Sequence, residues 1–173
     1  MTFQDFAKKG IPEDLTGWTV LDVGGYDGWA TKVCMERGAQ CTIVDNRQYR
    51  EYGWADPPEI PGVRYVEQDF LRWSYPADLV LCGNTIYHIE NPPMGIVKLR
   101  ELTQQQLILW TSYVTEGSDG DDWRWYPDGK GHPKGTVWAR PTIPGLMRTL
   151  YQAGFIHLNE LGRESDYVVV DAR

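Results

Sequence analysis

The sequence predicts a three-layer α/β fold built on a seven-stranded sheet, mostly parallel, with one antiparallel strand near the edge. Short apolar runs rich in β-branched residues alternate with stretches of helical periodicity. A glycine-rich turn joins the first such run to a helix, which is typical of nucleotide-binding sheets. A short link separates the last two predicted strands, which indicates an antiparallel hairpin. At 173 residues, the chain is expected to form one domain over 1–173.

The first strand and the turn after it organise the rest of the chain. Residues 19–23, with the sequence TVLDV, are expected to form a buried strand, and the turn GGYDG follows at 24–28. The glycines of this turn allow positive φ angles and a close approach of a ligand to the backbone. A helix is expected over 29–37, and a second strand over 41–44 places Asp45 at its carboxyl end.

The remaining elements continue the alternation of strand and helix. A short helix is expected over 2–9, and the residues after Asp45 are compatible with a one- or two-turn helix that ends at Gly53. Further strands are predicted over 63–67, 77–83, 106–114, 155–158 and 165–171, and further helices over 94–102 and 141–153. The link over 160–164 then joins the last two strands.

Acidic residues in and beside the glycine turn distinguish between possible ligands. A dinucleotide site usually has the pattern G-x-G-x-x-G and holds a pyrophosphate at the helix N-terminus. Here Asp22 precedes the glycines and Asp27 lies within the turn. Carboxylates repel a pyrophosphate but suit a ligand with an ammonium and a sulfonium group. Asp45 lies where an acid at a strand tip accepts hydrogen bonds from ribose hydroxyls. Plain turn chemistry is the alternative for the Asp27-Gly28 pair.

With these residues, the sequence resembles the class I S-adenosylmethionine-dependent methyltransferases, whose fold is Rossmann-like. The resemblance implies S-adenosylmethionine as cofactor and S-adenosylhomocysteine as product. It also implies that Asp69 accepts a hydrogen bond from the adenine amino group, whereas a helix N-cap is the competing role. The implied cofactor-binding residues are Asp22, Gly24, Gly25, Tyr26, Asp27, Gly28, Asp45, Asn46, Asp69, Phe70, Gly83 and Asn84.

The stretch after the fourth strand falls at the carboxyl edge of the sheet, where open α/β folds bind ligands. Residues 84–93 resemble the fourth motif of this family, in which a Tyr-His or similar pair precedes a proline-led helix. Asn84 departs from the acid or aromatic residue that many members have there. His88 is the candidate general base because its unperturbed pKa is near neutrality. A histidine bonded to backbone is the alternative for His88, and Tyr87 either orients a substrate or packs.

Residues 116–140 form a long segment rich in glycine, aspartate and tryptophan. A loop of this length in a compact domain is usually functional or disordered. Its aromatic residues favour a folded lid over a flat or apolar acceptor. The expected substrate contacts are Trp123, Trp125, Tyr126 and Trp138. Because the aspartates of this segment match no calcium loop, no metal is expected.

The predicted function is transfer of a methyl group from S-adenosylmethionine to an oxygen, nitrogen or carbon nucleophile, with alignment of the reactants supplying much of the rate. The aromatic lid and a net charge of −7 favour a small-molecule acceptor, while tRNA, another nucleic acid or a protein stays open. The Tyr-His-Ile-x-Asn-Pro string at 87–92 also resembles the wobble-uridine tRNA-modifying branch, although those chains are longer. The alternatives are a nicotinamide-dependent oxidoreductase on a similar sheet and a non-catalytic cofactor-binding subunit.

The distribution of apolar residues indicates where in the cell the protein is expected. No apolar run approaches the roughly 20 residues that span a bilayer, and residues 1–10 lack an apolar signal core. A cytoplasmic location without a membrane partner is therefore expected. Cys34, Cys41 and Cys82 lack metal-ligand spacing and fall in elements predicted to be buried, so reduced core thiols are expected.

Overall fold

The computed structural model describes residues 1–46, 59–116, 122–131 and 137–173. The strands of its larger sheet are β1 (Thr19–Val23), β2 (Gln40–Asp45), β3 (Arg64–Glu67), β4 (Ala77–Gly83), β5 (Thr103–Ser112), β8 (Leu158–Glu164) and β9 (Tyr167–Ala172). A second sheet pairs β6 (Trp123–Trp125) with β7 (Ala139–Pro141). The α-helices are α1 (Phe3–Gly10), α2 (Trp29–Glu36), α3 (Pro92–Leu102) and α4 (Ile143–Gln152).

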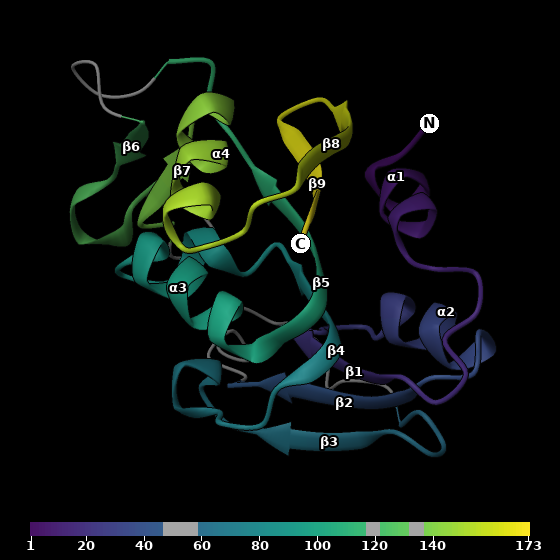
Figure 1. The fold of residues 1–173 in the computed structure, drawn as a ribbon. Coiled ribbons are helices and arrows are strands. Elements are labelled where there is room, and N and C mark those ends of the chain that lie inside the picture. Colours follow the sequence, from purple (N-terminus) through teal and green to yellow (C-terminus); the bar gives the residue numbers. More distant parts are fainter. Residues whose placement is uncertain (47–58, 117–121, 132–136) are drawn as a thin grey trace.

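The larger sheet has seven strands in the order β3-β2-β1-β4-β5-β9-β8 (Figure 1). All of them run in the same direction except β9, which is antiparallel to both β5 and β8. The expected mostly parallel sheet, with one reversed strand near its edge, is therefore confirmed. Strand order changes direction between β1 and β4, and open α/β sheets bind ligands at such a switch point.

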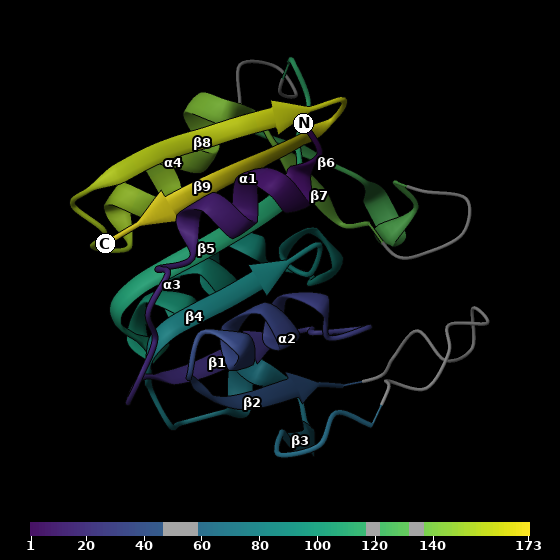
Figure 2. The ribbon, with the colours of Figure 1, turned by 90° about the vertical axis from the view of Figure 1, so that its right-hand side faces the viewer.

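Helices cover both faces of this sheet and give the expected three layers (Figure 2). On one face, α1 and α2 bury Ala7 and Ala30 against the central strands. On the other face, α3 and α4 bury Leu99 and Leu146. β4 is buried along most of its length because its near-continuous apolar sequence meets a helical layer on each side. None of the described helices is long and apolar enough to cross a membrane.

Side-chain caps fix where the helices begin. The Thr2 hydroxyl accepts a hydrogen bond from the Asp5 N–H at 3.2 Å, and the Asp5 carboxylate accepts one from the Thr2 N–H at 2.8 Å. This reciprocal capping box starts α1. Asn91 caps α3 by accepting from the Met94 N–H at 3.2 Å. These caps satisfy backbone donors that a helix leaves without an internal partner.

The three cysteines are free and buried, as the sequence predicts. Burial raises the pKa of each thiol, that of Cys41 to about 12. Thiols in this state are weak nucleophiles, so they serve as small core side chains.

The closing hairpin differs from the sequence prediction in its boundaries. The strand expected over 155–158 runs from Leu158 to Glu164, and the expected link over 160–164 lies inside it. The actual link is 165–166, where Ser165 has a φ of 53°. β8 is an edge strand with the polar sequence NELGRE after its first residue, so it carries little apolar signal. The helix considered possible after Asp45 lies outside the described residues.

Phe155 provides a direct test of the core beneath this hairpin. Its side chain is 0% exposed and packs in the cluster that contains residues of α3 and α4. We expect Phe155→Ala to lower the free energy of unfolding by about 3–5 kcal/mol, because a large cavity replaces the ring. Tyr151→Ala on the outer side of α4, where the ring is 65% exposed, should change it by about 0.5 kcal/mol or less. Urea unfolding followed by circular dichroism measures both, and equal losses would contradict this assignment.

Candidate active site

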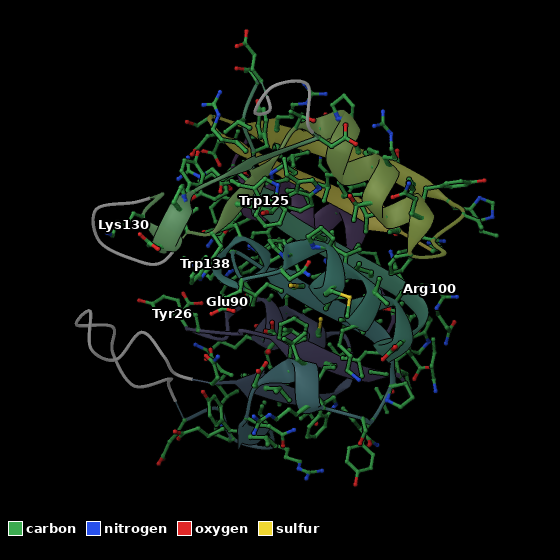
Figure 3. All side chains as sticks on the ribbon, turned by 90° about the vertical axis from the view of Figure 1, so that its left-hand side faces the viewer. Tyr26, Glu90, Arg100, Trp125, Lys130 and Trp138 are labelled. Atoms are coloured by element: carbon green, nitrogen blue, oxygen red, sulfur yellow. The ribbon has the colours of Figure 1, made fainter. Side chains whose placement is uncertain are left out.

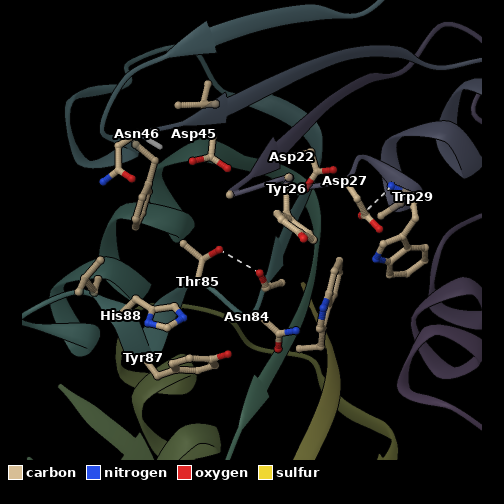
Figure 4. A pocket seen from close by; sticks show the side chains of 18 of the residues that line it. Asp22, Tyr26, Asp27, Trp29, Asp45, Asn46, Asn84, Thr85, Tyr87 and His88 are labelled. Carbon is tan, nitrogen blue, oxygen red and sulfur yellow. Dashed lines mark hydrogen bonds between the residues drawn. The ribbon is translucent and has the colours of Figure 1, made fainter. Parts of the chain in front are cut away.

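A pocket of about 390 Å³ lies at the carboxyl ends of the parallel strands. Its wall crosses the sheet from residues just after β3, through the tips of β2, β1, β4 and β5, to the first residue of β9. Phe3 and Gln4 of α1 also contribute to the wall. The volume is within the range of small-molecule sites. Figure 4 shows Asp45 and Asn46 on one side of Thr85, with Asn84 and Tyr87 on the other.

The glycine turn after β1 is packed tightly against the tip of β4. Gly24 has a φ of 67°, and its N–H donates to the Val44 carbonyl at 2.9 Å. A Cβ on Gly24 would lie 2.1 Å from the Thr85 hydroxyl oxygen, so no larger residue fits. That hydroxyl lies 2.9 Å from the Gly83 carbonyl oxygen and 3.3 Å from the Val23 carbonyl oxygen. The single hydroxyl proton is shared between the tips of β1 and β4, which holds them together.

Asp22 is a buried carboxyl group beneath this turn. It is 2% exposed and accepts a hydrogen bond from the Thr31 hydroxyl at 2.6 Å. The pKa of Asp22 is raised to about 6, chiefly by burial and also by the nearby carboxylates of Asp45 and Asp27, while the Thr31 hydrogen bond opposes the shift. The site therefore holds a carboxyl group whose charge changes close to neutral pH.

Two non-glycine residues of the pocket wall have left-handed backbones. Tyr26 has a φ of 43° and Asn84 a φ of 53°. This conformation is uncommon outside glycine, and such strain is concentrated at functional sites. Asn84 is tied to the sheet, since its N–H donates to the Trp110 carbonyl at 2.9 Å. Its side-chain oxygen is buried and has no hydrogen-bond partner among the described residues.

The tips of β2 and β3 bring further polar residues to the pocket. Asp45 and Asn46 line it, and the Asp45 carbonyl accepts from the Gln68 N–H at 3.1 Å. Asp69 also lines the pocket while its carboxylate accepts from the Leu71 N–H at 3.0 Å. Asp69 thus serves as the N-cap of the 3₁₀-helix η2 (Phe70–Arg72), which is the competing role considered from the sequence. The cap and the pocket position coexist.

Tyr87 and His88 lie in the 3₁₀-helix η3 (Ile86–His88), directly after the tip of β4. Both line the pocket, and their ring centroids are 4.3 Å apart. The His88 N–H donates to the Thr85 carbonyl at 3.0 Å, and the Tyr87 carbonyl accepts from the Trp138 N–H at 2.9 Å. These two backbone hydrogen bonds hold Tyr87 and His88 in place, and both residues line the pocket.

All of the cofactor residues implied by the resemblance line this pocket except Gly28, which is the N-cap of α2. The pocket wall does not contain the four aromatic residues of the predicted lid. Trp123 is 5% exposed, and its indole N–H donates to the Thr149 hydroxyl at 3.2 Å, so it packs in the core against α4. Trp125 and Trp138 lie on the same side of the molecule as Tyr26 (Figure 3).

Several lining residues were not predicted from the sequence: Phe3, Gln4, Trp29, Ala30, Val44, Tyr65, Gln68, Thr85, Ile89, Trp110 and Tyr167. The positions of Trp29 and Trp110 in the sequence could have indicated a place at the pocket. Trp29 begins the helix after the glycine turn, and Trp110 lies near the carboxyl end of β5. Phe3 and Tyr167 reach the pocket through tertiary packing. The described residues contain no cluster of metal-ligating side chains.

Solved structures similar to this one are S-adenosylmethionine-dependent methyltransferases. One from Mesorhizobium loti is 17% identical, with 96% of this chain and 95% of that chain covered and a TM-score of 0.67. A putative one from Listeria monocytogenes is 18% identical, with 96% and 94% covered and a TM-score of 0.69. A Burkholderia thailandensis 1,6-didemethyltoxoflavin-N1-methyltransferase, with bound 1,6-didemethyltoxoflavin and S-adenosylhomocysteine, is 21% identical, with 91% and 71% covered and a TM-score of 0.67.

The chain has the fold of the class I S-adenosylmethionine-dependent methyltransferases. No protein-family model matches the sequence, and no match was found among curated proteins. The fold predicted through the resemblance is therefore confirmed by structural likeness.

The buried carboxyl of Asp22 should make stability depend on pH. Its pKa is raised from 3.8 to about 6, so the folded state binds the proton more tightly than the unfolded state. This contribution to stability is fully present below about pH 4 and is lost as pH rises through about 6. A shift of this size corresponds to about 3 kcal/mol. We expect Asp22→Asn to be more stable than the wild type at pH 8 by up to about that amount.

The gain from Asp22→Asn should largely disappear near pH 4, because the wild-type carboxyl is then protonated in the folded state. Urea unfolding of both proteins at pH 4, 6 and 8 measures the difference. Glu36→Gln removes an equal charge from an exposed position on α2 and serves as the control. A difference between Asp22→Asn and wild type that does not vary with pH would contradict the buried, shifted carboxyl.

Proposed function

We propose that this protein is an S-adenosylmethionine-dependent methyltransferase that acts on a small-molecule acceptor. One observation carries the proposal: acidic side chains at or just after the tips of β1, β2 and β3 line a single pocket together with a glycine turn. The three positions are those of Asp22, Asp45 and Asp69. The fold shared with methyltransferases supports the same conclusion. Several similar solved structures hold S-adenosylmethionine or S-adenosylhomocysteine.

The residues of the pocket fit this cofactor. Gly24 and Gly25 line the pocket with backbone alone, and a Cβ added at either would lie within about 3 Å of a neighbouring side chain. The carboxylate of Asp45 lies at the strand tip where ribose hydroxyls are bound in such sheets. Asp27 in the turn offers negative charge to an ammonium or sulfonium group. A pyrophosphate would meet the same carboxylates unfavourably, which argues against a dinucleotide.

When bound, S-adenosylmethionine supplies an electrophilic methyl group. The chain's own residues then hold and orient the acceptor beside it, because alignment supplies a large part of the rate in such a reaction. His88 lies in the pocket wall directly after β4 and is assigned to accept the proton that a hydroxyl or N–H acceptor loses. Tyr87, whose ring contacts that of His88, is assigned to orient the acceptor. An acceptor that is already nucleophilic requires no such base.

We also assign a lid role to residues 116–140. The described part of this segment contains β6, η4 (Pro127–Gly129) and the start of β7, and it is tied to the pocket by the hydrogen bond from the Trp138 N–H to the Tyr87 carbonyl. Trp125 and Tyr126 come from β6 or its immediate end. Closure of the segment would bring Trp125, Tyr126 and Trp138 toward the pocket and exclude water from the reacting groups, while Trp123 stays in the core.

Calorimetric titration with S-adenosylhomocysteine tests the cofactor assignment. We expect the wild type to bind, and Asp45→Ala to bind at least about tenfold more weakly, which corresponds to about 1.4 kcal/mol. Glu36→Ala removes the same charge from an exposed position on α2 and should leave binding unchanged. A parallel titration with NADH, followed by its fluorescence, distinguishes an oxidoreductase. Binding of NADH but not S-adenosylhomocysteine would overturn the proposal, and turnover of labelled S-adenosylmethionine tests for a non-catalytic subunit.

Limited proteolysis tests the lid. Lys130 is exposed and follows η4 (Pro127–Gly129) within the segment, so trypsin should cleave after it. We expect S-adenosylhomocysteine to slow this cleavage several-fold if the segment closes on the pocket. Mass spectrometry of the fragments identifies the site, and Lys130→Gln confirms it by abolishing that fragment. Cleavage at an unchanged rate would count against a closing role.

A further inference from the structure

The pocket wall has two chemically different halves. We name the carboxylate half for Asp22, Asp27, Asp45 and Asp69, which follow or belong to β1, β2 and β3. The uncharged half comprises Phe3, Gln4, Trp29, Tyr87, Trp110 and Tyr167. Asn84, Thr85 and His88 lie at the junction, next to the tip of β4. No lysine, arginine or glutamate is among the described residues that line either half.

Aromatic rings from four elements form most of the uncharged half. Trp29 of α2 and Trp110 of β5 have ring centroids 5.4 Å apart at an interplanar angle of 48°. Phe3 of α1 and Tyr167 of β9 have centroids 5.6 Å apart at 32°. Tilted pairs at these distances are favourable for aromatic rings. A planar ring placed in this half would extend the same kind of contact on more than one side.

Gly83 allows one of these rings to approach the strand tip. The Trp110 indole lies across the backbone of Gly83, where an added Cβ would be 1.9 Å from the ring. Gly83 has no positive φ, so glycine is required there for space alone. The indole is 4% exposed and lines the pocket beside the junction. The Trp110 ring is therefore held next to the junction at the tip of β4.

The charges of the pocket disfavour ionised acceptors. An anionic acceptor would find no cationic side chain among the described lining residues and would be repelled by the carboxylate half. A cationic acceptor could contact the aromatic rings, but it would lie beside the positive sulfonium. A neutral acceptor avoids both penalties.

The junction also presents a hydrogen-bond acceptor. The side-chain oxygen of Asn84 is buried without a partner among the described residues, and a buried polar atom left in this state is costly. A hydroxyl or N–H group on the ligand would satisfy it. His88 lies at the same junction and can take up the proton of such a group.

We propose that the uncharged half binds a neutral, planar aromatic or heteroaromatic acceptor that carries a hydroxyl or N–H group. This inference rests on the proposed function and specifies the substrate class of the same site. The ring lies among Phe3, Trp110 and Tyr167, and its polar group is directed to the junction at Asn84 and His88.

A matched series of small probes tests this inference with the full chain saturated by S-adenosylhomocysteine. The probes are 2-naphthol, which is planar and neutral at pH 7, 2-naphthoate, which adds a negative charge, and decahydro-2-naphthol, which is not planar. Choline serves as the cationic probe. We expect calorimetry to show 2-naphthol binding at least tenfold more tightly than each of the other three. Equal affinities, tighter binding of 2-naphthoate or choline, or no binding of 2-naphthol would overturn the inference.

Variants of Tyr167 locate the binding. Tyr167→Ala should weaken 2-naphthol binding at least fivefold, while Tyr167→Phe, which keeps the ring, should retain it within twofold. Tyr151→Ala removes an exposed ring from the outer side of α4 and should have no effect. S-adenosylhomocysteine affinity should be similar in all three, because the carboxylate half is unchanged. Unaltered 2-naphthol binding by Tyr167→Ala would overturn the inference.

The two levels of proposal fail in different ways. If the wild type does not bind S-adenosylhomocysteine, the proposed function is wrong. If it binds S-adenosylhomocysteine but does not distinguish the probes, the methyltransferase proposal stands and the substrate class is wrong. Near-ultraviolet circular dichroism of each variant shows whether a loss of binding comes with a loss of tertiary structure.

Discussion

The contact between the turn after β1 and the tip of β4 is the constraint on which this site depends. Gly24 must lack a side chain because the Thr85 hydroxyl occupies that space, and the same hydroxyl lies between the Val23 and Gly83 carbonyls. Parallel strands normally diverge once their hydrogen-bond ladder ends. Here the Thr85 side chain links the two strands beyond the last hydrogen bond of the sheet. The acidic residues on one side and the aromatic residues on the other are positioned relative to this contact.

The residues of the carboxylate half were predictable because they are close together in sequence. A strand, a glycine turn, a helix and a second strand form one continuous unit, and the carboxyl ends of parallel strands meet at one edge. Asp22, Asp45 and Asp69 could therefore be placed at neighbouring tips from their order alone. The strand expected over 77–83 was likewise predicted correctly, because a strand covered on both faces has a near-continuous apolar sequence.

The other half was not predictable in the same way. Phe3 and Tyr167 come from opposite ends of the described chain and meet through the packing of α1 on β8 and β9, which no local pattern reveals. Trp123 lies in a segment whose composition favours a lid. Its burial against α4, however, depends on where β6 pairs with β7. β8 was displaced in the prediction because an edge strand can be polar on both faces. The sequence thus specifies the carboxylate half of the pocket more directly than the uncharged half.

The contact of α1 with β9 has a consequence for the order in which the pocket can be assembled. The carboxylate half draws on residues up to Asp69, and the junction is complete at His88. The contact of Phe3 with Tyr167 cannot form until β8 and β9 have been made, since α1 packs on these last two strands of the sheet. Long-range contacts of this kind form late because closing a long loop costs entropy before the contact is made. A chain emerging from the ribosome would therefore acquire the carboxylate half of the pocket well before the uncharged half.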